Sequence, residues 1–288
     1  MTGTSGTRTG TAPAGRGRRE RLRAETTAEI KDTALRLMAS GGPDAITLRA
    51  IAREMGMTAN AIYGYFATRD DLVTRLIDDV YSALADAVEA AWADATAESP
   101  AEVSAEGPAE AWADATAQSP AEASAATPAE SPAEGPAEDP AARILAWARA
   151  FRAWALANPE GFRLVYGDPV PGYKAPEEGP APDAARRVCT GLAGLAAAAW
   201  PYAEPLYRDS AFTWDDFDAG LLDKVRPAFP ELPPAGVALA LRLWGHLHGL
   251  VALEVYGHLG RQTTSPDKLF QEELTRLLTT LGVPKSGG

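Results

Sequence analysis

The side chains best suited to recognition chemistry gather in one short stretch, residues 47–69. Arg49 carries a guanidinium that can donate two parallel hydrogen bonds to guanine, and Asn60 carries an amide that can pair with adenine. Tyr63 and Tyr65 add hydroxyl groups of the kind that contact phosphates and fix the register of a protein on DNA. The chemistry that this stretch predicts is therefore recognition of duplex DNA and not the making or breaking of bonds.

The chain offers little for catalysis or metal binding. It contains three histidines and a single cysteine, Cys189. His246 and His248 are two residues apart on a predicted helix and point to different sides, so they cannot chelate one ion together. The sequence lacks the short motifs of serine hydrolases, zinc proteases, phosphate-binding loops and dinucleotide folds. We therefore expect no enzyme activity, no metal and no cofactor.

Two short helices must position the candidate DNA-contacting side chains. Thr47 is a good N-cap for a helix over 48–55, which a glycine ends. Thr58 caps a second helix over 59–66. Two short helices joined at a glycine by a tight turn form a helix-turn-helix unit, whose second helix enters the major groove.

Longer helices are predicted on both sides of this unit. Apolar residues at helical spacing indicate a helix over 25–40, and a further helix runs from Arg69 to at least Ala90. Ile62 and Phe66 are expected to point inward against them. This leaves the polar side chains of the stretch on the outside.

The run TLRAIAREMGMTANAIYGYFATRDDLVTRL resembles the N-terminal domain of TetR-type transcriptional regulators. The resemblance covers about residues 21–85. The chain departs from the family pattern at Tyr65, where His is commoner, and at Arg69, where Lys is commoner. It also has Gly64 where the family often has a larger side chain, and a glycine inside a helix costs about 1 kcal/mol relative to alanine.

The resemblance and the residue chemistry together predict a set of DNA contacts. Arg49 is expected to read guanine, Asn60 to read adenine, and Ala59 to touch a thymine methyl group. The remaining members resemble phosphate anchors or helix caps. Simpler interpretations are a solvated charge for Arg49, a first-turn residue for Asn60 and partly buried core aromatics for the tyrosines. The full predicted set is Thr47, Arg49, Thr58, Ala59, Asn60, Tyr63, Tyr65 and Arg69.

The charge of the chain is unevenly distributed. The net charge is −12, yet residues 1–70 hold 11 Lys or Arg against 7 Asp or Glu. This local excess matters more for DNA than the total, because salt limits the reach of distant charges to about 10 Å. The segment GRGRRERLR at 15–23 contains five arginines. It is interpreted either as a flexible arm that enters the minor groove or as a disordered tail with non-specific phosphate affinity.

Residues 91–130 are an internal duplication. Residues 91–110 and 111–130 match at sixteen of twenty positions, and residues 91–140 hold 11 Asp or Glu with no Lys or Arg. The repeat lacks the apolar face that a stacking unit requires. We therefore interpret 91–140 as an expanded, disordered linker, either a solvated spacer or a partner-binding segment, and expect the preceding helix to extend to about Ala97.

The rest of the chain is predicted to be helical. No segment of the ordered zones alternates polar and β-branched residues, so we predict an all-α fold. Helices are expected over 141–161 and 266–281. The apolar stretch 237–255 includes charged residues and histidines, and it is interpreted as a buried helix and not a membrane span.

This second half resembles the ligand-binding and dimerisation domain of a TetR subgroup with a Trp-Gly-His motif, here Trp244-Gly245-His246. The resemblance implies a homodimer, in which the last two long helices pair with those of a second subunit. It also implies a pocket whose unknown small-molecule effector changes the spacing of two DNA-reading heads. Expected pocket residues, each open to the alternative of plain core, are Trp147, Phe151, Trp154, Phe162, Tyr166, Trp200, Trp244 and His248.

These observations predict a transcriptional regulator, most simply a repressor that its effector releases from DNA. The alternative is a helical small-molecule-binding protein with a vestigial or altered DNA-binding head. One cysteine and no secretory signal at the N-terminus favour the cytoplasm, without a membrane partner. The expected segments are a disordered basic arm (1–20), the helix-turn-helix domain (21–90), the acidic linker (91–140) and the effector-binding and dimerisation domain (141–284).

Overall fold

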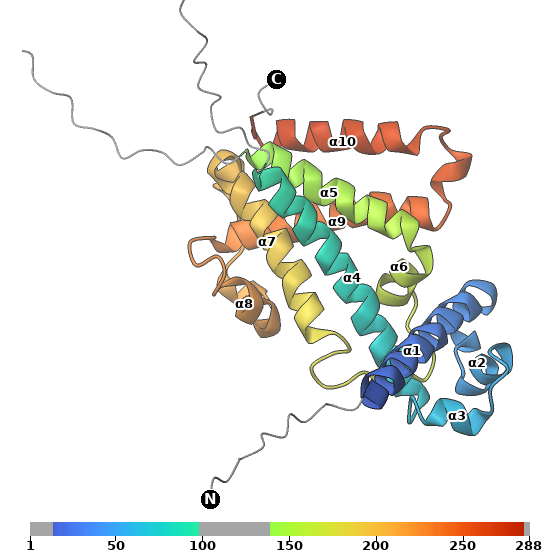
Figure 1. The fold of residues 1–288 in the computed structure, drawn as a ribbon. Helices are drawn as coiled ribbons and strands as arrows, with labels where there is room; N and C mark the ends of the chain where they lie inside the picture. Colours follow the sequence, from blue (N-terminus) through green and yellow to red (C-terminus); the bar gives the residue numbers. More distant parts are fainter. Residues whose placement is uncertain (1–13, 98–138, 285–288) are drawn as a thin grey trace, which may run out of the picture.

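The computed structural model describes residues 14–97 and 139–284, and the regular elements in these two ranges are all helices (Figure 1). This confirms the predicted all-α fold. The α-helices are α1 (Ala14–Gly41), α2 (Leu48–Glu54), α3 (Ala59–Tyr63), α4 (Arg69–Ala97), α5 (Pro140–Ala157), α6 (Pro159–Tyr166), α7 (Pro182–Ala203), α8 (Ala219–Val225), α9 (Pro234–Val255) and α10 (Pro266–Thr280). Short 3-10 turns lie at Pro43–Ala45, Glu204–Tyr207, Trp214–Asp216 and Leu259–Arg261.

The N-terminal helices close around a small apolar core. Ile30 of α1, Ile51 of α2 and Ile62 of α3 are fully buried, together with Leu72 at the start of α4. Burying one such side chain contributes about 1.5–3 kcal/mol, so this cluster holds the two short helices in place although neither is long enough to be stable alone. The polar sides of α2 and α3 are left outside the core.

Helix α4 is shared by both halves of the molecule. Its first turns lie in the N-terminal core through Leu76, whereas Leu84 and Val88 lie in a second core with α5, α7 and α9. Trp147 and Phe151 of α5 are among the largest buried side chains of this second core. One continuous helix therefore contributes side chains to both cores.

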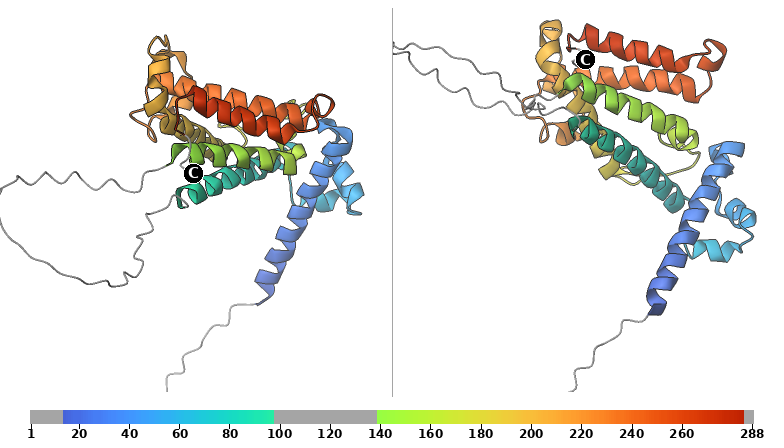
Figure 2. Two further views of the ribbon diagram at one scale, coloured as in Figure 1. Left: turned by 90° about the horizontal axis from the view of Figure 1, so that it is seen from above. Right: turned by 45° about the horizontal axis from the view of Figure 1, so that its top comes forward.

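The helix boundaries correct two expectations. Residues 14–20 of the predicted disordered arm form the first turns of α1, whose N-terminal half extends away from the body of the protein (Figure 2). Arg, Glu, Leu and Ala predominate from residue 18 onward, and these are strong helix formers. The second helix of the motif ends at Tyr63 and not at 66, because the chain turns at Gly64. Phe66 is nevertheless buried, as predicted.

The duplicated segment is described only at its start. Helix α4 ends at Ala97, which confirms the predicted extension. Residues 98–138, on which the prediction of a disordered linker rests, lie outside the described residues.

Helix α9 is apolar and long enough to span a membrane by length and composition alone. In the structure, Val237, Leu243, Leu247 and Val251 are buried in the second core, which fits the interpretation of a core helix. Its other side carries exposed residues, including Arg242 and His246.

Candidate nucleic-acid interface and internal cavity

The outer surface of α2 and α3 carries most of the side chains predicted to contact DNA. Arg49 and Asn60 are exposed, and Tyr63 is 49% exposed although it is a large aromatic residue. Ile51 and Ile62 of the same two helices are buried. The structure therefore separates an apolar inner side from a polar outer side, as a helix that enters a groove requires.

Two threonines fix where these helices begin. The Thr47 hydroxyl accepts a hydrogen bond from Ala50 N at 3.1 Å, and the Thr58 hydroxyl accepts one from Ala61 N at 3.3 Å. Both threonines are exposed, and Ala59 beside Thr58 is partly buried. Their predicted capping role is thus present in the structure, and an N-cap of this kind contributes about 1 kcal/mol.

Tyr65 is less available than Tyr63 because an arginine of α1 packs on it. The Arg23 guanidinium lies 5.0 Å from the centre of the Tyr65 ring and donates a hydrogen bond to Gly64 O at 2.7 Å. Sequence reasoning missed this contact, since it assigned Arg23 to a flexible arm. In the structure Arg23 fastens the turn after α3 to α1.

Arg69 has a structural role that the sequence did not indicate. Its guanidinium donates hydrogen bonds to Ile46 O at 2.6 Å, to Pro171 O at 2.8 Å and to Pro43 O at 3.2 Å. All three guanidinium nitrogens are therefore bonded to backbone carbonyls. Three of its five N–H donors thus hold the segment before α2 against the loop after α6, and the expectation that Arg69 anchors a phosphate stays a prediction.

A cavity of about 420 Å³, here called the Tyr166 cavity, lies inside the C-terminal half between α4, α6, α7, α8 and α9. Tyr166, Trp244 and His248 from the predicted pocket set line it. Tyr81 and Cys189 also line it and were not predicted. Tyr81 lies on α4 and Cys189 on α7, so their place in the cavity depends on packing between helices far apart in sequence.

The other predicted pocket residues do not line the Tyr166 cavity. Two of them pack behind its wall, and three lie elsewhere. Phe151 and Phe162 pack behind the cavity wall, with Phe151 5.5 Å from Trp244 and Phe162 5.3 Å from His248 between ring centres. Trp147, Trp154 and Trp200 do not line the Tyr166 cavity. Trp147 lines a different cavity, Trp154 borders a surface pocket near α1, and Trp200 stacks on Tyr207.

The Tyr166 cavity is lined by groups that are neutral near pH 7. Burial raises the pKa of the Tyr166 hydroxyl far above its ordinary value, and burial also raises the pKa values of Tyr81 and of the Cys189 thiol. Burial lowers the pKa of His248. The buried Tyr166 hydroxyl oxygen has no partner at normal hydrogen-bond distance within the described part of the chain, although the neighbouring Tyr81 hydroxyl also contributes to its raised pKa. The cavity therefore suits an uncharged, largely apolar molecule with one polar atom.

The loop after α6 connects this cavity to the N-terminal half. Tyr166 is the last residue of α6, and Tyr173 in the following loop shares a 2.8 Å hydrogen bond with the Thr74 hydroxyl of α4. Lys174 N donates to the Asp70 carboxylate at 3.3 Å. We call residues 167–181 the clasp loop, because it joins the C-terminal half to the start of α4.

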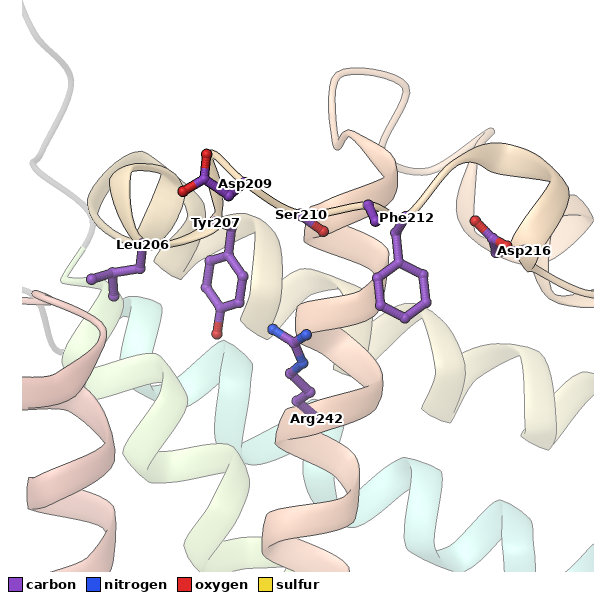
Figure 3. A pocket seen from close by; sticks show the side chains of 8 residues that line it. Leu206, Tyr207, Asp209, Ser210, Phe212, Asp216 and Arg242 are labelled. Carbon is purple, nitrogen blue, oxygen red and sulfur yellow. The ribbon is translucent and has the colours of Figure 1, made fainter.

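A second hollow lies on the outer surface beside α9, with a volume of about 480 Å³. The Arg242 side chain points from α9 toward the loop that carries Tyr207 and Phe212 (Figure 3), and its guanidinium lies 5.0 Å from the centre of the Tyr207 ring. Leu206 and Phe212 at its edge are exposed. No predicted effector residue lines this hollow.

Comparison with known proteins agrees with both halves of the fold. Residues 30–76 match the family described as bacterial regulatory proteins of the tetR family, and residues 144–277 match the tetracyclin repressor-like C-terminal domain. An HTH-type transcriptional regulator of Mycobacterium tuberculosis is 32% identical over 268 residues, which cover 92% of this chain and 95% of the relative. The chain belongs to the TetR family. A regulator of Mycobacterium bovis matches with the same identity and coverage.

Solved structures support the assignment. The crystal structure of a regulatory protein is 29% identical, with a TM-score of 0.59, and the match covers 90% of this chain and 98% of that one. A TetR-family regulator from Rhodococcus RHA1, at 15% identity and a TM-score of 0.50 over 90% and 98% of the two chains, shares the fold. This TetR protein is thus a helix-turn-helix transcriptional regulator that binds DNA, and its family consists of regulators and not enzymes.

Proposed function

We propose that this TetR-family regulator is a cytoplasmic homodimer that represses transcription and is released from its operator by a small molecule. The DNA-binding part of this proposal is supported by the arrangement of α2 and α3. Arg49, Asn60 and Tyr63 are exposed on the outer surface, while Ile51 and Ile62 of the same helices are buried.

Each exposed side chain has a proposed role. Arg49 reads guanine and Asn60 reads adenine, because these side chains pair with those bases in the major groove. Ala59 contacts a thymine methyl group. Thr47, Thr58, Tyr63 and Tyr65 contact phosphates, with Tyr63 the strongest candidate because its ring is free of the Arg23 contact that covers Tyr65.

The proposed dimer interface lies on the outer sides of α9 and α10. On α9, Leu241, Gly245, Gly249 and Leu253 recur at four-residue spacing, and both leucines are exposed. Leu269 of α10 is also exposed. A Cβ added at either glycine meets no neighbouring atom. A two-fold dimer that covers this stripe removes exposed leucines from water and lets two α9 helices approach closely at the glycines.

The proposed effector site is the Tyr166 cavity. Its volume fits a small organic molecule, and its lining is apolar apart from Tyr166, Tyr81, Cys189 and His248. The ligand class that fits is an uncharged, mostly apolar molecule that hydrogen-bonds the Tyr166 hydroxyl. The clasp loop offers the route by which a shift of α6 changes the position of the DNA-reading helices, provided that the ligand binds the two states with different affinity.

The proposed subgroup rests on the Trp-Gly-His motif alone, and the three residues of this motif have different surroundings. Trp244 lines the Tyr166 cavity, and Gly245 lies in the exposed stripe. His246 Nε2 lies 3.0 Å from Glu273 Oε1 of α10. The motif thus combines a cavity wall, a proposed dimer surface and a link between the last two long helices.

An unbiased selection of duplexes from a random pool, repeated at several salt concentrations, tests DNA reading and the dimer together. We expect a two-fold symmetric motif whose half-sites lie one helical turn or a multiple apart, and an affinity that falls steeply with salt. A single asymmetric half-site contradicts the dimer. Selection of no sequence at all favours the alternative function, a small-molecule-binding protein with a vestigial head.

A thermal-shift screen tests the effector site separately. Neutral, apolar compounds that stabilise the wild-type protein are expected to lose that effect in Cys189→Phe, whose side chain fills the Tyr166 cavity. Compounds that stabilise both proteins equally bind elsewhere and contradict the assignment.

A further inference from the structure

Helix α7 separates the Tyr166 cavity from a larger one. The larger cavity, of about 940 Å³, is lined by residues of α4, α5, α7 and α8 together with Pro227, Ala228 and Phe229, and we call it the Trp147 cavity. Cys189 lines the first cavity and the next residue, Thr190, lines the second. We propose that the Trp147 cavity is a second binding site, independent of the proposed effector site, and that it takes a flat aromatic anion such as an arene carboxylate or sulfonate.

The shape of the cavity favours a flat ring system. Trp92 and Phe229 supply aromatic surface on its walls, and the buried Trp147 ring borders it. Gly194 lies beside two of them, since a Cβ there lies 3.4 Å from the Phe229 ring and 3.8 Å from the Trp92 ring. A side chain at this position contacts both rings, and glycine leaves that space for a guest. Aromatic surfaces stack favourably on a flat partner.

A buried donor on the cavity wall lacks an acceptor. Trp147 is 1% exposed, and its indole nitrogen has no hydrogen-bond partner among the residues that the structure describes. Buried indole N–H groups usually find one. Gly191 is the wall residue beside it, because a Cβ there lies 2.9 Å from the Trp147 Nε1 atom. An oxygen of a bound carboxylate or sulfonate placed at this wall satisfies the donor.

The charges around the cavity favour an anion. Four cations line it, against the two carboxylates Glu89 and Asp223. Arg187 is paired with Glu89 and Asp86, and Arg186 with Asp183. Lys224 has no ion pair within residues 14–97 and 139–284, yet it lines the cavity. Arg143, the fourth cation, lies over the Trp92 ring and bonds the Thr96 hydroxyl at 3.0 Å. Lys224 is therefore the cation that we assign to the anionic group of the ligand.

Two dyes of matched shape test the proposal on the full-length protein. One is 8-anilinonaphthalene-1-sulfonate, and the other is the neutral N-phenyl-1-naphthylamine, which lacks the sulfonate. We expect saturable binding of one sulfonate dye per chain, followed by fluorescence and by calorimetry. Thr190→Phe fills the Trp147 cavity and is expected to weaken this binding at least tenfold. The matched control Cys189→Phe fills the Tyr166 cavity instead and is expected to leave the affinity within about twofold.

The proposed contact between Lys224 and the anionic group of the ligand is tested in the same assay. Lys224→Gln is expected to weaken binding of the sulfonate dye about five- to tenfold and to leave binding of the neutral amine unchanged, because only one probe carries the charge. Lys268→Gln, on the exposed surface of α10, serves as the control for a general change in protein charge. Circular dichroism and the melting temperature verify that each variant folds. If Thr190→Phe does not fold, Ala198→Phe on the same wall of the cavity replaces it.

Several results overturn the proposal. They are no saturable binding by the full chain, equal binding by Thr190→Phe and wild type, and loss of binding in Cys189→Phe instead. Because the assay contains no DNA and its control variant fills the proposed effector site, a failure here leaves the proposed function standing.

Discussion

The Arg69 guanidinium and the Pro171 carbonyl oxygen lie 2.8 Å apart, although the two residues are separated by 102 positions in the chain. The same guanidinium bonds Ile46 O, one residue before the Thr47 cap of α2. One side chain therefore joins the clasp loop, which follows Tyr166 in the chain, to the segment just before α2. In the proposed mechanism, a movement of α6 that shifts Pro171 acts on α2 and α3 through this residue.

Replacing Arg69 with Met is expected to destabilise the protein by about 1–3 kcal/mol, because partly buried carbonyls lose their donor. Denaturant unfolding measures the loss. The matched control is Arg53→Met, which removes an exposed arginine of α2 and is expected to change stability by less than about 0.5 kcal/mol. An Arg69 variant of unchanged stability contradicts this structural role, and a reduced salt dependence of its DNA affinity supports the predicted phosphate-anchor role.

Replacing Tyr63 with Phe removes one exposed hydroxyl and keeps the ring. If this hydroxyl contacts a phosphate, the affinity for every duplex falls about three- to tenfold, whatever its sequence, and the melting temperature stays the same. Fluorescence anisotropy on specific and random duplexes measures both affinities. Tyr202→Phe, exposed in the C-terminal half, is the control. Equal affinities of the Tyr63 variant and wild type are incompatible with the proposed role.

Replacing Leu253 with Glu places a charge on the exposed stripe of α9. A dimer that buries this stripe is expected to dissociate into folded monomers, because an unpaired charge in an apolar interface is costly. Sedimentation velocity reports the oligomeric state, and circular dichroism verifies the fold. Leu156→Glu, on the exposed surface of α5, is the control and is expected to stay dimeric. A dimeric Leu253 variant places the interface elsewhere.

His248 is expected to make the protein less stable in mild acid. Burial lowers its pKa in the folded state below the ordinary value of 6.5. The unfolded chain therefore binds the proton more readily, and stability falls as the pH drops from about 6.5 through the lowered folded pKa. Denaturant unfolding between pH 7.5 and 5 is expected to show a weaker pH dependence for His248→Gln than for wild type. Identical pH profiles show that His248 does not titrate differently on folding.

The sequence predicted what depends on local spacing. The caps at Thr47 and Thr58, the buried Ile62 and the exposed Tyr63 all follow from helix periodicity and capping chemistry, and the structure agrees with each. The strong likeness of this stretch to known regulators has the same origin, because a short motif carries its geometry in a few neighbouring residues.

The contacts that the sequence did not indicate join distant segments of the chain. Arg69 has the charge of a phosphate anchor, and only its partners Pro43 and Pro171 reveal its structural role. Trp147 and Phe151 recur at helical spacing on α5. Trp147 nevertheless lines the cavity on the other side of α7 and not the Tyr166 cavity. Periodicity identifies a buried side chain, but it does not tell which of two cavities that side chain lines.

The affinity of Asn60→Asp for a selected duplex tests most directly whether the outer surface of α3 enters the DNA groove. The substitution is isosteric, and a carboxylate in the first turn of a helix does not destabilise it. We expect the affinity to fall by about a hundredfold at unchanged melting temperature, because the new charge faces base acceptors and phosphates, while the exposed control Gln262→Glu binds like wild type. An Asn60→Asp protein that binds the duplex as tightly as wild type contradicts the proposal that this surface reads DNA.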